Sequence, residues 1–128
     1  SHNDPATAQR IITAALAKNK DIVAVFATNL FSAQGVATGI KQAGKAGKIS
    51  VVGFDAGSDQ VKALKAGVVQ ALIAQQPATI GSKGIEAAVA AIAGKSVSPK
   101  KVQTGFTILT KKNIDTAAGT KAQYRDAC

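Results

Sequence analysis

The hydrophobic positions of this chain alternate between a spacing typical of helices and one typical of buried strands. After Asp4 and Pro5, apolar residues recur every three or four positions as far as Leu16. This spacing predicts an amphipathic helix that Asp4 caps and that ends near Lys18. A continuous apolar run, rich in β-branched residues, then occupies 22–27. Such a run is typical of a strand buried on both faces.

The same alternation continues along the chain. Further helices and strands are predicted in turn at 31–43, 49–54, 58–66, 68–74, 77–94 and 102–109. Strands and helices that alternate with short loops are typical of parallel βαβ units. We therefore expect an α/β fold in which helices flank a parallel sheet. The remainder, 110–128, is polar and rich in small residues, and we expect it to run over a surface.

Composition narrows the classes of function. The chain has 128 residues, of which 46% are hydrophobic and 18% are charged, which fits one folded domain. No apolar run reaches the roughly 18 residues that cross a bilayer. The net charge of +9 would fit nucleic-acid binding, but the lysines are scattered and Arg occurs only as Arg10 and Arg125. We interpret the lysines as a solvated surface and expect no nucleic-acid partner.

Motifs for catalysis and cofactor binding are missing from the sequence. It contains no complete Gly-x-x-x-x-Gly-Lys-Ser/Thr phosphate loop, no dinucleotide glycine fingerprint after the first strand and no Gly-x-Ser-x-Gly elbow. Gly35 and Gly39 lie within a helical pattern, where they favour close packing. Glu86, His2 and Cys128 are the one Glu, the one His and the one Cys. We therefore expect no enzyme activity, no cofactor and no metal site, and Cys128 is either a free thiol or half of a bridge to another segment.

Polar side chains stand where the first three predicted strands end. Asn29, Asp55 and Gln75, here called the rim residues, follow or end these strands. Ligands of open α/β sheets bind beyond the carboxyl ends of the strands, so the rim residues should gather at one edge. Carboxylates accept and carboxamides both donate and accept hydrogen bonds, which suits sugar hydroxyls. Phe31 and Phe54 would cover an apolar sugar face. The alternative is that Asn29 merely caps a helix and Asp55 merely forms a turn.

The same strand ends resemble a known family. Three segments, in this order and spacing, are similar to the ribose-type periplasmic binding proteins, the solute receptors of ABC sugar importers: 25–29, 51–55 and 71–77. The resemblance covers nearly the whole chain. It implies a type 1 periplasmic binding fold, in which two α/β lobes close over a sugar and the rim residues contact the sugar hydroxyls.

The resemblance also implies how the chain is divided and what it lacks. Residues 1–75 would form part of the C-terminal lobe, and 76–128 would form the hinge, a helix and a strand of the N-terminal lobe, and the C-terminal tail. Family members are considerably longer, so the chain would be about half of the two-lobe fold. It would then be a proteolytic fragment, half of a split protein or an engineered piece. An Arg that the family supplies from the missing part has no counterpart here, and Arg10 does not match it.

Partners and location follow from the same resemblance. The implied partners are a sugar or polyol, an ABC permease, and either the missing N-terminal segment or another copy of the chain. The implied location is the periplasm or the cell exterior, as a secreted protein or lipoprotein, with a signal that is not in this chain. The runner-up is the effector-binding core of a LacI-type transcription repressor, which shares this architecture. A flavodoxin-like or response-regulator domain would need an acidic cluster and a phosphate loop, which the sequence lacks. The choice among pentose, hexose and polyol stays open.

Overall fold

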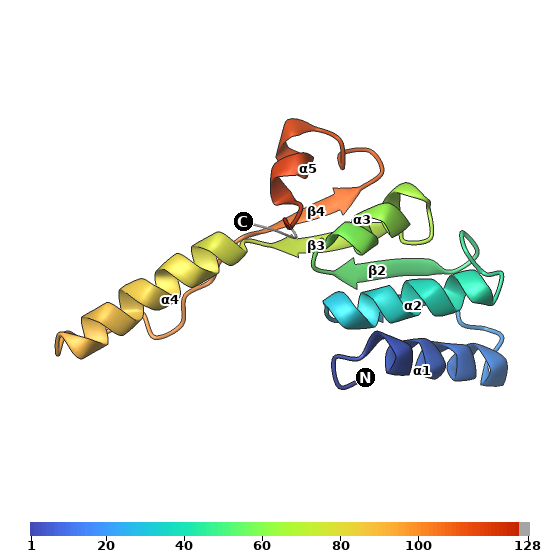
Figure 1. Cartoon of the computed structure of the whole chain (residues 1–128), viewed down its shortest axis with the longest axis horizontal. Helices are drawn as coiled ribbons and strands as arrows, with labels where there is room; N and C mark the ends of the chain where they lie inside the picture. The colour runs from blue at the N-terminus through green and yellow to red at the C-terminus, as the bar shows by residue number, and fades with distance from the viewer. Residues whose placement is uncertain (126–128) are drawn as a thin grey trace. The chain divides into compact units, whose positions relative to one another are not determined.

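The computed structural model describes residues 1–125, and helices and strands alternate along them (Figure 1). The elements are, in order, α1 (Pro5–Lys18), β1 (Ala24–Ala27), α2 (Leu30–Gln42), β2 (Ser50–Phe54), α3 (Ser58–Lys65), β3 (Ala71–Gln75), α4 (Pro77–Ile92), β4 (Phe106–Thr110) and α5 (Ala117–Ala122). The predicted α/β fold class is confirmed. Helix α1 begins directly after its predicted N-cap. The Asp4 side chain accepts a hydrogen bond from the Thr7 backbone N–H at 2.7 Å, as its position before Pro5 predicts.

The chain forms two compact units. The first consists of Ser1–Ala74 together with the residues from Thr107 onward, and the second consists of Gln75–Phe106. The first boundary falls one residue before the division at 75 that the sequence suggested. Most of β4 and all of α5 belong to the first unit.

The first unit is built on a four-stranded sheet with the strand order β1-β2-β3-β4. β1, β2 and β3 are parallel, with Ala27 opposite Gly53 and Gly53 opposite Leu72. β4 lies beside β3, and its arrow points the opposite way in Figure 1. The three parallel strands therefore end at the same edge of the sheet, which is the arrangement that the rim hypothesis requires.

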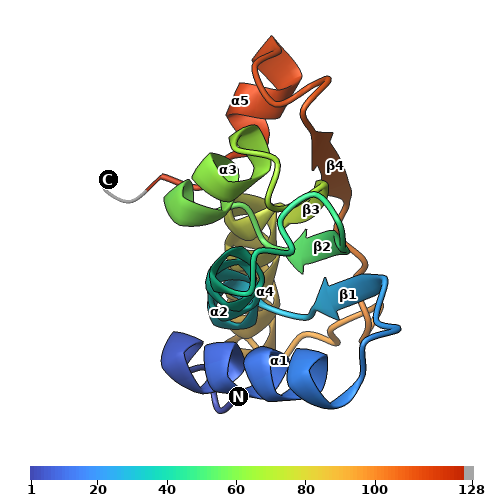
Figure 2. The same ribbon diagram turned by 90° about the vertical axis from the view of Figure 1, so that its right-hand side faces the viewer.

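The hydrophobic core lies between one face of the sheet and the helices α2 and α3, and α1, which packs beside α2, adds Ile12 and Leu16 to it (Figure 2). Its largest fully buried side chains come from α2, α3, all strands but β1, and two connecting segments: Ile40, Leu64, Leu72, Leu109, Ile114, Val51 and Val69. Strand residues that alternate with the core residues turn to the other face, where Phe26 is 55% and Ile108 is 53% exposed. The expectation that the strands are buried on both faces is therefore wrong for this chain.

Two glycines of α2 let it lie against α1 with backbone close to backbone. A Cβ on Gly35 would lie 2.2 Å from the Pro5 carbonyl oxygen and 2.6 Å from the Ala8 Cβ, and a Cβ on Gly39 would lie 2.5 Å from Ile12 Cγ2. These distances are far below van der Waals contact, so any side chain at either position would force the helices apart. The interpretation of both glycines as packing residues is confirmed.

The segment after β4 is more ordered than its composition suggests. The Thr116 hydroxyl accepts a hydrogen bond from the Gly119 backbone N–H at 3.1 Å and caps the short helix α5. Ile114 is 1% exposed, and Tyr124 packs against the core. A six-residue helix made of Ala, Gly, Thr and Lys shows no apolar periodicity, and for this reason the sequence pattern missed α5. Cys128 lies outside the described residues.

The second unit consists mainly of α4, which begins at Pro77 as predicted and is followed by Gly94 at φ +68°. No described residue of α4 is buried, and Ile85, Val89 and Ile92 are 68%, 60% and 88% exposed. Across residues 1–125, no helix has the length and apolar character needed to cross a membrane.

The α1–α2 contact can be tested with Gly35→Ala. The added methyl group would overlap the Pro5 carbonyl, which belongs to the α1 backbone and cannot rotate away, so we expect the free energy of unfolding to fall by about 1–3 kcal/mol. The matched control is Gly81→Ala in α4, where a Cβ would meet nothing within 4 Å. It should leave stability unchanged or raise it by up to about 1 kcal/mol, because Ala is the better helix former. Urea unfolding followed by circular dichroism measures both, and equal effects would contradict the packing role.

Candidate functional site

Asn29 joins the end of β1 to the start of α2. Its backbone is extended, and its side-chain Oδ1 accepts a hydrogen bond from the Ser32 backbone N–H at 2.8 Å. The side-chain amide donates to Asn3 Oδ1 at 2.7 Å. Asn29 is therefore the N-cap of α2, as the alternative interpretation of the sequence proposed. This role fixes the side chain at the carboxyl edge of the sheet.

Asp55 lies at the end of β2 in an unusual backbone conformation. Its φ is +77°, a region that few residues other than glycine adopt but that Asp tolerates. The backbone N–H still donates to the Ile73 carbonyl at 2.8 Å, which continues the pairing of β2 with β3. The carboxylate turns toward α2, where Oδ2 accepts the Leu30 backbone N–H at 3.1 Å. Oδ1 accepts the Tyr124 hydroxyl at 2.9 Å.

The N-terminus of α2 brings Asn29 and Asp55 together. Leu30 is the first residue of the helix and Ser32 the third, and their amides bond to Asp55 and Asn29 respectively. The first amides of a helix have no partner within the helix and favour a negatively charged acceptor. Two rim residues from different strands therefore share one helix end. Gln75 is the last residue of β3, as predicted, and begins the second unit.

The two aromatic candidates, Phe31 and Phe54, lie close in the sequence to Asn29 and Asp55. Phe31 lies in the first turn of α2 and is 41% exposed. Phe54 is the last residue of β2, directly before Asp55, and its side chain is partly buried. Both phenylalanines therefore come from the segments that hold Asn29 and Asp55.

Gln60, which is not among the residues predicted from the sequence, braces the loop that carries Asp55. It is 3% exposed. Its side-chain amide donates to the Phe54 carbonyl at 2.7 Å, and its Oε1 accepts the Gly57 backbone N–H at 2.8 Å. The two bonds hold the backbone on either side of Asp55. A Gln three residues after a helix N-cap is a recognised capping signal, so its position after Gly57 was the available clue.

Tyr124 is the second residue of the site that the sequence did not predict. It is the one Tyr of the sequence. Its hydroxyl bonds to Asp55 across a separation of 69 residues. No local pattern indicates a contact between residues so far apart in the sequence.

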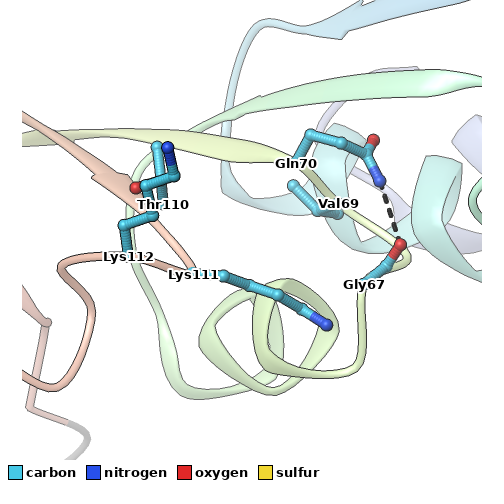
Figure 3. Close-up of a pocket in the computed structure, with 6 residues that line it drawn as sticks. All are labelled: Gly67, Val69, Gln70, Thr110, Lys111 and Lys112. Carbon is cyan, nitrogen blue, oxygen red and sulfur yellow. Dashed lines mark hydrogen bonds between the residues drawn. The ribbon is translucent and has the colours of Figure 1, made fainter.

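A separate open pocket of about 530 Å³ lies at the opposite edge of the sheet (Figure 3). Its lining residues lead into β3, end β4 or directly follow β4: Gly67, Val69, Gln70, Thr110, Lys111 and Lys112. The Gln70 side chain is occupied with the backbone, since it accepts the Val51 N–H at 2.6 Å and donates to the Gly67 carbonyl at 2.9 Å. Parallel strands begin at this edge, whereas ligands of open α/β sheets bind where they end. We therefore place the candidate site at Asn29 and Asp55.

The chain is similar to curated proteins over part of its length. The ribose import binding protein of Haemophilus influenzae is 44% identical over 85 residues, which are 66% of this chain and 28% of that protein. The D-allose-binding periplasmic protein of Escherichia coli is 38% identical over 89 residues, which are 70% of this chain and 29% of that protein. The chain thus spans less than a third of the length of these curated relatives.

Solved structures give the fold. An ABC transporter solute-binding protein from Agrobacterium vitis, bound with α-D-tagatopyranose, is 41% identical with a TM-score of 0.91 over 98% of this chain and 42% of that one. A second protein from Agrobacterium vitis, with bound D-fucose, is 35% identical with a TM-score of 0.87 over 97% of this chain and 42% of that one. The fold is that of an incomplete type 1 periplasmic binding protein lobe.

The match to a family model covers most of the chain. Residues 1–96 match the model described as the periplasmic binding protein domain. They include β1, β2, β3 and all three rim residues. This chain belongs to the periplasmic binding protein domain family.

Proposed function

We propose that this chain is part of the extracytoplasmic sugar receptor of an ABC importer and that it supplies the Asn29–Asp55 half of the sugar site. The observation that carries the proposal is the pairing of these two side chains at the N-terminus of α2, at the carboxyl edge of a parallel sheet. Relatives named for ribose and allose, and similar structures with bound tagatose and fucose, support a sugar as the ligand.

The chemistry of the pair favours an uncharged polyhydroxylated ligand. A carboxylate offers about four acceptor positions and can accept several hydrogen bonds at once. Asp55 would accept hydrogen bonds from sugar hydroxyls, while the carboxamides of Asn29 and Gln75 would donate and accept. Phe31 and Phe54 would cover the apolar face of the ring. This chemistry binds a ligand without making or breaking bonds, so we propose a binding protein and not an enzyme.

Binding would use two lobes that close over the sugar. We assign the first unit to the C-terminal lobe, and the second unit to the hinge and to a helix of the N-terminal lobe. The boundary between Ala74 and Gln75 supports a hinge at Gln75-Gln76-Pro77. Closure would shift the population from an open to a closed form, which the ABC permease then recognises. The periplasmic relative supports an extracytoplasmic location, and the transport names of the relatives support a receptor over a repressor.

The exposed face of the sheet supports the proposal that the remaining segment of the receptor is a partner of this chain. Parallel sheets occur almost only with both faces covered, and here Phe26 and Ile108 stay more than half exposed. Relatives contain more than twice as much chain as the part that matches. We propose that helices from that additional part cover this face in the complete receptor.

The sugar site can be tested with Asp55→Gly in the full-length protein that contains this chain. Glycine adopts φ +77° without strain, so the loop is kept while the carboxylate is lost. We expect binding of D-ribose, D-allose or D-tagatose, measured by isothermal titration calorimetry, to weaken by at least about 30-fold, or about 2 kcal/mol, because buried sugar hydroxyls lose their acceptor. Asp59→Gly, which removes an exposed carboxylate of α3, should change the affinity less than twofold. Unchanged affinity in Asp55→Gly for every sugar that binds would contradict the assignment.

The covering of the sheet can be tested by assembling the receptor from two chains. Phe26→Asp places a charge on the open face and should reduce the amount of complex between this chain and the separately produced remainder, as measured by native mass spectrometry. The matched control is Ile11→Asp on α1, since Ile11 is 56% exposed and Phe26 is 55% exposed. If the two substitutions weaken the complex equally, or neither does, the open face is not the surface that the remainder covers.

A further inference from the structure

We propose that Tyr124 is a positioning residue of the sugar site, which acts by fixing the orientation of the Asp55 carboxylate. This inference rests on the proposed function of Asp55. The Tyr124 hydroxyl donates to Asp55 Oδ1 at 2.9 Å. Its backbone N–H donates to the Ala56 carbonyl at 2.9 Å. Tyr124 therefore holds the loop after β2 at two adjacent residues, once through the side chain and once through the backbone.

The two carboxylate oxygens of Asp55 accept hydrogen bonds from donors that lie on either side of it in the sequence. Leu30, which precedes Asp55 by 25 residues, donates to Oδ2, and Tyr124, which follows it by 69 residues, donates to Oδ1. The terminal torsion of an Asp side chain has a broad energy profile, so a carboxylate held at one oxygen can still rotate. A donor on each oxygen fixes the plane of the group. The acceptor directions that would meet sugar hydroxyls are then set before the sugar binds, which lowers the entropy cost of binding.

Tyr124 is itself held in place without its hydroxyl. Its ring is partly buried and packs against the hydrophobic core. The preceding residue, Gln123, donates from its side-chain amide to the Ile114 carbonyl at 2.8 Å, and Ile114 is 1% exposed. The segment after α5 is thus tied to the core next to the Asp55 loop. Removing the hydroxyl alone should leave this segment in position, so its effect on the carboxylate can be separated from its effect on folding.

A double-mutant cycle in the full-length protein tests the inference. The variants are Tyr124→Phe, Asp55→Gly and the double substitution, and the probes are D-ribose, D-allose and D-tagatose in isothermal titration calorimetry. We expect Tyr124→Phe to raise the Kd of the best-bound sugar by about 3–10-fold, as loss of one orienting bond predicts. In the Asp55→Gly background the same substitution should change the Kd less than twofold, because the hydroxyl is proposed to act on the site through Asp55.

A control in the same segment separates positioning from stability. Gln123→Ala removes the hydrogen bond to Ile114 and should lower the Tm while the Kd stays within twofold of the unsubstituted protein. Equal Kd values for Tyr124→Phe and the unsubstituted protein, or additive effects in the cycle, would overturn the role of Tyr124 and leave the sugar site standing. If the unsubstituted protein binds none of the three sugars, the proposed function falls, and the role of Tyr124 falls with it.

Discussion

The N-terminus of α2 is the feature on which the candidate site depends. A helix begins with amides that have no partner within the helix, and here two of them are bonded by side chains that arrive from two neighbouring strands. Asn29 follows β1 in sequence, while Asp55 reaches the same helix end from β2 and adopts φ +77° to do so. The strain of that conformation, roughly 1 kcal/mol or more, is offset by a charge-assisted bond at the positive end of the helix dipole. The site is therefore built from backbone amides as much as from side chains.

The sequence predicts those parts of the structure that short-range patterns encode. Asp4 before Pro5, Asn29 after an apolar run and the glycines within a helical spacing each act through neighbours a few residues away, and the structure confirms their positions. Tyr124 could not be found in this way, because its bond to Asp55 spans 69 residues and depends on how the chain returns to the sheet. The short helix α5 lacks apolar periodicity, so it was missed as well.

The single covered face of the sheet explains why strands that look fully buried in the sequence are not so in this chain. Phe26, Val52 and Ile108 have the apolar character of core residues, but the helices α2 and α3 lie on the other side of the sheet (Figure 2). This apolar character fits the proposal that additional chain, such as the longer relatives contain, covers this face in the complete receptor. The close packing of α1 on α2 through Gly35 lets the covered side form a dense core by itself.

The measurement that tests the central claim most directly is an NMR titration of the complete receptor with this chain labelled with ¹⁵N and D-ribose, D-allose or D-tagatose as the ligand. The account predicts saturable shifts of the backbone amides of Leu30, Ser32 and Asp55, which lie at the shared helix end. The amides of Gly67 and Gln70, which line the open pocket at the other edge of the sheet, should stay unchanged. Saturable shifts at Gly67 and Gln70 with no change at Leu30 and Asp55 would contradict the account and place the sugar in that pocket.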